Sequence, residues 1–150
     1  MKLARHGVAV DLPQGWDGRI YRRALGAVRT PAILHAANFA LPANRGDYGS
    51  GAVERMQPGD VLVTLVEHDG SAAGTALFAH DGPPPPLTPR DFSPHMLQRT
   101  LAGQSGVQRF FTWNGRPFCL YVVLGSHAAR PRLVPLVNAV TRSIAVSTFA

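Results

Sequence analysis

Apolar residues fall into a few short runs along this chain, and the two clearest flank Asn114 and Gly115. Asn-Gly is the strongest two-residue signal for a β-hairpin, because both central positions of a type I′ turn need a positive φ. The turn predicts a hairpin over residues 107–124 in which Phe111 faces Phe118. Since apolar residues occupy both faces of this hairpin, we expect it to lie in the centre of an antiparallel sheet that is covered on both sides.

The tip of the predicted hairpin differs from its body. Pro117 has no amide hydrogen to donate, so the neighbouring strand is expected to end before it. Trp113 and Arg116 should then protrude and stay partly exposed, with the guanidinium over the indole ring. Both residue types are common interface anchors, so we take them as partner-binding candidates and expect their joint replacement to leave the melting temperature nearly unchanged. In the alternative, Trp113 folds over its own hairpin and stiffens the turn.

Two other segments, residues 32–41 and 60–70, are also apolar on both faces and rich in residues that favour strands. We predict a buried strand in each. The first contains His35 and Asn38 on opposite faces. These two polar residues either line a pocket or, in the interpretation that we favour for the histidine, have their hydrogen bonds satisfied inside the core.

The remaining extended segments are short. Residues 1–23 alternate and then turn at a proline and a glycine, which predicts a strand, a turn and a second strand paired as a hairpin. Residues 81–90, with the sequence DGPPPPLTPR, cannot form a helix or a central strand, because proline lacks the amide donor and holds φ fixed. We interpret them as a stiff extended surface connection rather than a proline-rich ligand for an SH3-type domain.

Three segments predict helices. Residues 51–56 predict a short one that Pro58 stops, and residues 91–103 predict another, with a proline in its first turn and a glycine at its end. A third is expected after Pro131, where apolar residues recur at helical spacing before a last strand. Pro135 conflicts with this helix unless the helix begins close to it.

Three stretches together resemble the PsbP-like fold: the opening GVAVDLPQGW, the long apolar hairpin late in the chain, and the ending LVNAVTRSIAV. This superfamily includes extrinsic subunits of the oxygen-evolving photosystem, an import cofactor that binds the Ran GTPase, and bacterial lipoproteins and stand-alone domains. The resemblance implies an α+β fold, an antiparallel sheet with helices on both faces (an α/β/α sandwich). It implies no catalytic residues, because the superfamily shares no catalytic set, and function does not follow from fold.

The length of 150 residues predicts a single domain over residues 1–150, and 45% hydrophobic with 16% charged residues predicts a packed core. We expect a bacterial, cytoplasmic protein without a membrane contact, because no run of eighteen apolar residues occurs and the N-terminus lacks the apolar core of a secretory signal.

The formal net charge is +6, and fourteen of the fifteen basic residues are arginine. The charge is uneven: residues 1–30 carry six basic and two acidic groups, residues 31–110 five and seven, and residues 111–150 four and none. If the two ends meet in the fold, they would form one basic face that binds nucleic acid or another polyanion. Arg130 and Arg132 are the partner-binding candidates of the C-terminal part.

Residues that could act in catalysis or bind a metal ion are few in this sequence. Six histidines are never closer than twelve positions apart, and Cys119 is the single cysteine, so we predict neither a metal site nor a cofactor. Apolar neighbours in a strand indicate that Cys119 is a structural thiol rather than a nucleophile. The glycine-rich residues 45–56 lack a phosphate-binding motif and indicate a flexible loop. Nearly every aspartate stands in a turn-like context, so we predict no catalytic acid and base.

The sequence therefore favours a small non-enzymatic binding or accessory module that contacts a protein partner or a second copy of itself. The alternative is the binding of nucleic acid or another polyanion through the basic N- and C-terminal segments.

Overall fold

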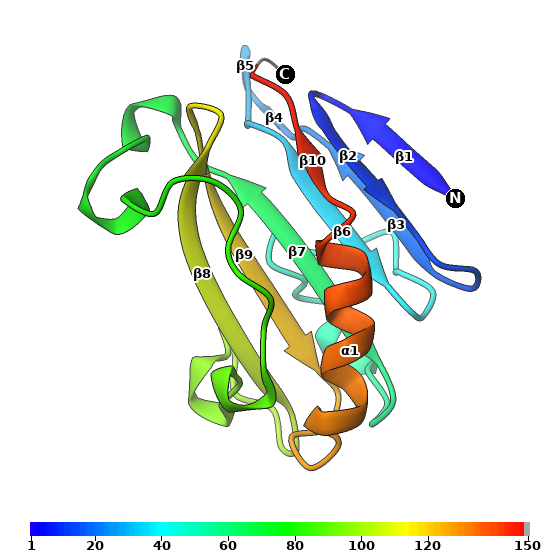
Figure 1. Cartoon of the computed structure of the whole chain (residues 1–150). Coiled ribbons are helices and arrows are strands. Elements are labelled where there is room, and N and C mark those ends of the chain that lie inside the picture. Colours follow the sequence, from blue (N-terminus) through cyan, green and yellow to red (C-terminus); the bar gives the residue numbers. More distant parts are fainter. Residues whose placement is uncertain (149–150) are drawn as a thin grey trace.

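The computed structural model, which describes residues 1–148, has an antiparallel five-stranded sheet as its main element (Figure 1). The strand order in this main sheet is β3-β6-β7-β9-β8. The strands are β3 (Asp17–Tyr21), β6 (Ile33–Ala37), β7 (Val61–Glu67), β8 (Ser105–Trp113) and β9 (Arg116–Leu124). The buried strands predicted within residues 32–41 and 60–70 are thereby confirmed as β6 and β7.

The predicted hairpin over residues 107–124 is confirmed as β8 and β9, in the register that pairs Phe111 with Phe118. Asn114 and Gly115 form the turn with φ of 51° and 76°. The expectation that both strands are central was wrong for β8, which is an edge strand with β9 as its neighbour. As Pro117 predicted, β7 stops short of it, since its last pair joins Glu67 to Phe118.

The N-terminal part pairs differently from the prediction. The strands β1 (Lys2–Arg5) and β2 (Val8–Asp11) form a hairpin around His6 and Gly7, whose φ angles are positive, and β10 (Ala145–Val146) pairs with the other edge of β2. The expected pairing within residues 1–23 was wrong, because β2 and β3 belong to different sheets. A third small hairpin joins β4 (Ala24–Leu25) to β5 (Val28–Arg29).

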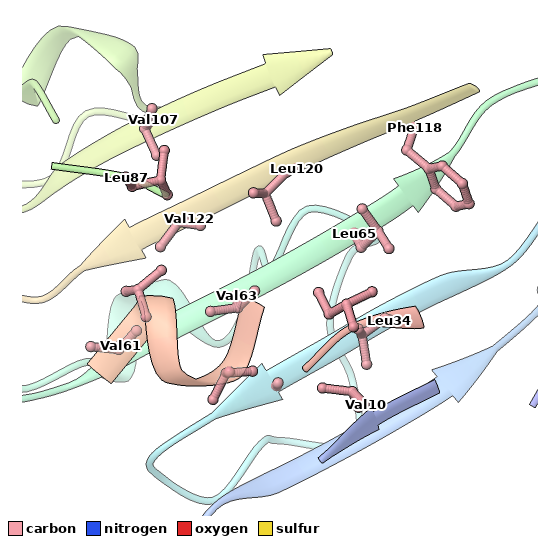
Figure 2. Packing of buried hydrophobic residues seen from close by; sticks show 14 of the residues in the cluster. Val10, Leu34, Val61, Val63, Leu65, Leu87, Val107, Phe118, Leu120 and Val122 are labelled. Atoms are coloured by element: carbon pink, nitrogen blue, oxygen red, sulfur yellow. The ribbon is translucent and has the colours of Figure 1, made fainter. Parts of the chain in front are cut away.

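One face of the main sheet, here named the helix face, packs against α1 (Arg130–Thr141) and β2. The helix was predicted after Pro131, and Pro135 is tolerated on its exposed side. Figure 2 shows side chains of neighbouring strands, among them Leu65 and Leu120, that project on the side where α1 lies. Together with β2 and α1 they form the larger apolar core of the molecule.

The opposite face, named the loop face, is covered by loops with single 3-10 turns instead of helices. The predicted helices over residues 51–56 and 91–103 were wrong: the chain forms only short turns there and elsewhere on the loops. These turns are η1 (Val53–Arg55), η2 (Gly70–Ala72), η3 (Ala76–Phe78), η4 (Pro89–Asp91) and η5 (Pro94–Met96). Of these, η4 contacts α1 on the helix face.

Local hydrogen bonds explain why residues 91–103 do not form an α-helix. Asp91 and Thr88 cap each other across η4, and the Ser93 side chain accepts from the His95 amide at the start of η5. Each turn ends in an extended residue after three positions. The predicted α/β/α sandwich is therefore wrong: the described chain is mainly antiparallel β-sheet, with α1 as its one α-helix. No helix among the described residues is long and apolar enough to span a bilayer.

Candidate functional site

A hollow of about 560 Å³, here named the strap pocket, opens on the helix face. One wall is an extended strap, residues 83–87, and the other is the C-terminal end of α1. Three side chains of the main sheet, Leu65, Phe111 and Leu120, form its floor. They are buried members of the larger core, so the pocket reaches the interior of the protein.

The strap owes its shape to four consecutive prolines, which fix φ and need no hydrogen-bonding partner for an amide. Its two ends are fastened. The Gly82 amide donates to the Thr112 carbonyl at 2.8 Å, on the edge strand β8. At the other end Asn138 of α1 binds the Leu87 backbone twice, accepting from its amide at 3.0 Å and donating to its carbonyl at 2.8 Å. The extended connection predicted for residues 81–90 thus forms a stiff wall between β8 and α1.

The polar groups around the strap pocket are few. Both amide atoms of Asn138 are occupied by Leu87. The guanidinium of Arg142, which is exposed at the end of α1, has no hydrogen bond or ion pair within residues 1–148. No Asp, Glu, His, Cys or Ser lines the pocket among the described residues. The pocket therefore combines a large apolar surface with one unpaired cation at its rim.

Trp113 lines the strap pocket, half-buried, with its ring centroid 6.5 Å from that of Phe111. Its predicted neighbour at the hairpin tip behaves differently. Arg116 is only 5% exposed, and its guanidinium carbon lies 5.4 Å from the centroid of the Phe118 ring rather than over the indole of Trp113. The expected exposure of Arg116, on which its partner-binding role depended, was wrong.

The partners of Arg116 explain its burial. Its guanidinium donates to both carboxylate oxygens of Glu67 at 2.9 and 2.8 Å. It also donates to the carbonyls of His6, Gly7 and Ser147, at 3.0 to 3.1 Å. A bidentate Arg–carboxylate pair with further acceptors satisfies a buried charge well. Since these partners lie far away along the chain, no local pattern could reveal them.

Arg130 and Arg132 begin α1, at the end of the helix opposite to the strap pocket. Arg130 donates to the His127 carbonyl at 2.8 Å and to the Pro89 carbonyl at 3.1 Å, whereas Arg132 is exposed. The chain ends do meet, through β2 and β10. They do not combine the basic residues into one face, because Arg116 is buried and these two residues lie at the far end of α1. Their contact with a partner stays a prediction.

His35 and Asn38 line neither the strap pocket nor the smaller hollow on the loop face. His35 is fully buried, with Nε2 2.7 Å from the Asp47 carbonyl oxygen and Nδ1 accepting from Arg45 at 2.7 Å. Burial lowers its pKa to about 4. Asn38 donates to the Gly59 carbonyl and accepts from the Val61 amide. Both residues are satisfied parts of the fold.

The other residues considered for catalysis or metal binding also have structural roles. Burial raises the pKa of the Cys119 thiol to about 11, which suppresses the nucleophilic thiolate. Within residues 1–148 no three His, Cys, Asp or Glu side chains are grouped so that they could hold a metal ion. The glycine-rich loop holds Asp47 against His35, and Gly51 lies so close to the Asn44 carbonyl that a Cβ there would stand 2.7 Å from its oxygen.

The smaller hollow, about 310 Å³, lies on the loop face beside Tyr121 and Arg99. Two of its polar groups are engaged: the Tyr121 hydroxyl accepts from the Gln98 amide at 2.7 Å, and Arg99 pairs with Glu54 at 2.7 Å. Gln104, which also lines it, donates through its side-chain nitrogen to the Val53 carbonyl at 2.7 Å, whereas its Oε1 atom is buried without a hydrogen-bond partner among the described residues.

A comparison with protein-family models, curated proteins and solved structures found no match for this chain. The resemblance to the PsbP-like superfamily therefore stays a prediction. The strap pocket was not predicted from the sequence. The proline run was the one local signal for it, whereas the floor residues and Arg142 are brought together only by the fold.

Proposed function

We propose that this protein is a non-enzymatic binding module that takes an apolar small molecule into the strap pocket. The observation that carries the proposal is the pocket itself, about 560 Å³ with a floor of buried core side chains. Ligand pockets typically measure about 300–1,000 Å³ and are mostly apolar with a few polar groups. A molecule seated there would bury its surface against Leu65, Phe111 and Leu120 without any change in the main sheet.

The composition of the pocket supports binding rather than catalysis. General acid–base or nucleophilic chemistry needs a titratable or nucleophilic side chain within reach of the substrate. Among the described residues that line the pocket, Thr141 carries the one hydroxyl, and Arg142 is the one charged residue. Neither has an adjacent base in the pocket.

Titration with the neutral fluorescent probe N-phenyl-1-naphthylamine tests the proposal. Thr141 lines the pocket, so Thr141→Trp should fill part of it, whereas Leu136 lies exposed on the same helix outside it and Leu136→Trp is the matched control. We expect saturable one-to-one binding to the wild type and the control, and at least about tenfold weaker binding to Thr141→Trp. Absence of saturable binding to the wild type, or equal binding to a folded Thr141→Trp variant, would overturn the proposal.

A second candidate function, the binding of an acidic protein surface, rests on the hairpin β4–β5. Leu25 and Val28 near its tip are 54% and 66% exposed. Arg29 belongs to β5 and Arg22 shortly precedes β4. Burial is the main cause of the lowered pKa of His6 in the neighbouring β1–β2 turn, and the positive charges of Arg5, Arg22 and Arg29 lower that pKa further. Exposed aliphatic side chains with a cationic rim suit a protein partner. A nucleic acid would instead call for aromatic side chains on which bases can stack.

Two defined probes distinguish the partners of this hairpin: a peptide of alternating Glu and Leu, and an oligodeoxythymidine of equal charge. The second candidate expects the peptide to bind more tightly and the double variant Leu25→Ser, Val28→Ser to lose most of that binding. Equal binding of both probes, unchanged in the double variant, would favour the polyanion alternative instead.

A further inference from the structure

We infer that the strap pocket selects apolar molecules that end in a carboxylate, such as medium-chain monocarboxylic acids, and that Arg142 binds the carboxylate. This inference rests on the proposed function, since it names the ligand class of the same pocket. It depends on the position of Arg142, on the kind of polar groups around the pocket, and on the charge of the helix end beside it.

Arg142 stands at the mouth of an apolar hollow with its charge unpaired. Four other arginines of the described chain hold a carboxylate: Arg23, Arg99, Arg109 and Arg116. Arg142 has no such partner, although it follows directly on α1 and borders the pocket. An apolar molecule on the pocket floor would reach this guanidinium with its polar end. A guanidinium presents a planar pair of donors that matches a carboxylate.

The other polar side chains of the pocket among the described residues are those of Asn138, Trp113 and Thr141. The Asn138 side chain already forms one hydrogen bond through its oxygen and one through its nitrogen, both to Leu87. Trp113 can only donate, through its indole N–H. No carboxylate of the described chain lines the pocket. The one charged group that the described residues place at the pocket is therefore a cation, which favours an anionic head group over a cationic one.

The end of α1 limits the charge of the ligand. The C-terminus of a helix carries the negative end of the macrodipole, and Arg142 lies at this end. No second cation lines the pocket among the described residues. A dianionic phosphate would face one guanidinium and the carbonyl end of a helix, whereas a carboxylate needs a single bidentate partner. The balance of charge favours a monoanion.

Arg142 could instead act only within the protein, since a cation near the end of a helix stabilises the helix. Such a role would change the thermal stability of an Arg142→Gln variant and leave its choice of ligand untouched. The discriminating measurement is therefore ligand preference: decanoate against decanol, which share the apolar chain and differ in the head group. Both displace N-phenyl-1-naphthylamine in a competition titration carried out below the concentration at which decanoate forms micelles.

We expect the wild type to bind decanoate about 3-fold to 10-fold more tightly than decanol, a ratio that falls in 1 M NaCl. Arg142→Gln should bring decanoate down to the affinity of decanol and leave decanol unchanged. Arg132→Gln is the matched control, because it removes an exposed arginine from the far end of the same helix. It should keep the preference.

Several results would overturn the inference. Equal affinities of decanoate and decanol for the wild type would mean that the pocket binds apolar molecules, as proposed, but does not recognise the carboxylate. Equal losses in the Arg142 and Arg132 variants would indicate a general electrostatic attraction. Tighter binding of decyl phosphate than of decanoate would assign the pocket to phosphates. If neither decanoate nor decanol displaces the probe, the proposed function fails together with the inference.

Discussion

The two faces of the main sheet look alike in sequence and are covered in different ways. The helix face packs aliphatic and aromatic side chains against α1 and β2, with the ion pairs Arg116–Glu67 and Arg109–Asp91 at its edge. The loop face also buries apolar residues, but His35 and Thr64 lie fully buried among them. Their hydrogen bonds run to backbone carbonyls, of Asp47 and Tyr121 respectively.

The two faces differ because a helix and a loop present different groups to the strands that they cover. A helix satisfies its own backbone and offers only side chains, so the strands beneath it can be purely apolar. A loop brings unpaired carbonyl and amide groups into the interior, and these need polar partners from the sheet, as the Asp47 carbonyl has in His35. The Thr64 hydroxyl instead donates within the sheet, to the Tyr121 carbonyl of β9. Alternation within a strand cannot distinguish these two covers when both faces are mostly apolar. Stability measurements on each face can.

The largest loss of stability is expected from Arg116→Met, which leaves the Glu67 carboxylate buried without its partner and removes the bonds to three carbonyls. Breaking a buried ion pair costs about 3–5 kcal/mol of stability. The loss of the hydrogen bonds to the three carbonyls adds to this cost. Urea unfolding measures the loss, and the double variant Arg116→Met, Glu67→Met should recover part of it. An Arg116→Met variant as stable as the wild type would restore the expectation of an exposed hairpin tip.

Phe118→Ala should cost nearly as much, about 3–5 kcal/mol, because the ring is fully buried on the helix face and stacks on Phe111 with centroids 5.9 Å apart. The matched variant on the loop face is Phe110→Ala, whose half-buried ring contacts Phe78 at 5.6 Å. It should cost about half as much in the same urea experiment. Equal costs would mean that the loops pack as tightly as the helix.

The pH dependence of stability should reveal His35 on the loop face. Its folded pKa of about 4 lies below the unfolded value of 6.5, so the unfolded chain alone gains a proton as the pH falls between these values. Stability is complete above pH 6.5 and should drop by about 3 kcal/mol as the pH falls to about 4. A His35→Gln variant should lack this part of the drop. If wild type and variant lose equal stability over this range, His35 titrates normally in the folded protein.

The smallest effect is expected from Thr64→Val, which keeps the shape of the side chain and removes the hydroxyl that donates to the Tyr121 carbonyl at 2.7 Å. The loss should be about 1 kcal/mol. Thr100→Val at an exposed position is the control and should change little. A gain in stability from Thr64→Val would show that apolar packing alone suffices on the loop face.

Local signals predicted the parts of the fold that local rules control. Asn114 and Gly115 set the hairpin and its register, Pro117 predicted the end of β7, and the apolar spacing after Pro131 predicted α1. The failures have two causes. The pairing of β2 with β10 depends on a partner more than 130 residues away, which no pattern in either segment contains. Around Ser93 the cause is local, because side chains that cap short turns compete there with an α-helix.

The candidate site was less predictable than the fold. Trp113 was identified, and it does line the strap pocket, but Arg116 was assigned to the surface because Glu67 is 49 residues away along the chain. The proline run was correctly interpreted as an extended connection. That it closes a pocket depends on Asn138, whose amide fastens Leu87 from α1.

The sheet formed by β1, β2 and β10 joins the first residues described to the last, and this has a consequence for how the chain folds. Residues 8–9 pair with residues 145–146, and the carbonyl partners of Arg116 come from residues 6, 7 and 147. Contacts between segments so far apart in sequence form slowly, because a long loop must close before they stabilise the chain. During synthesis, β10 leaves the ribosome after the other strands of the described residues. The guanidinium of Arg116 therefore gains its full set of partners only after residue 147 has emerged.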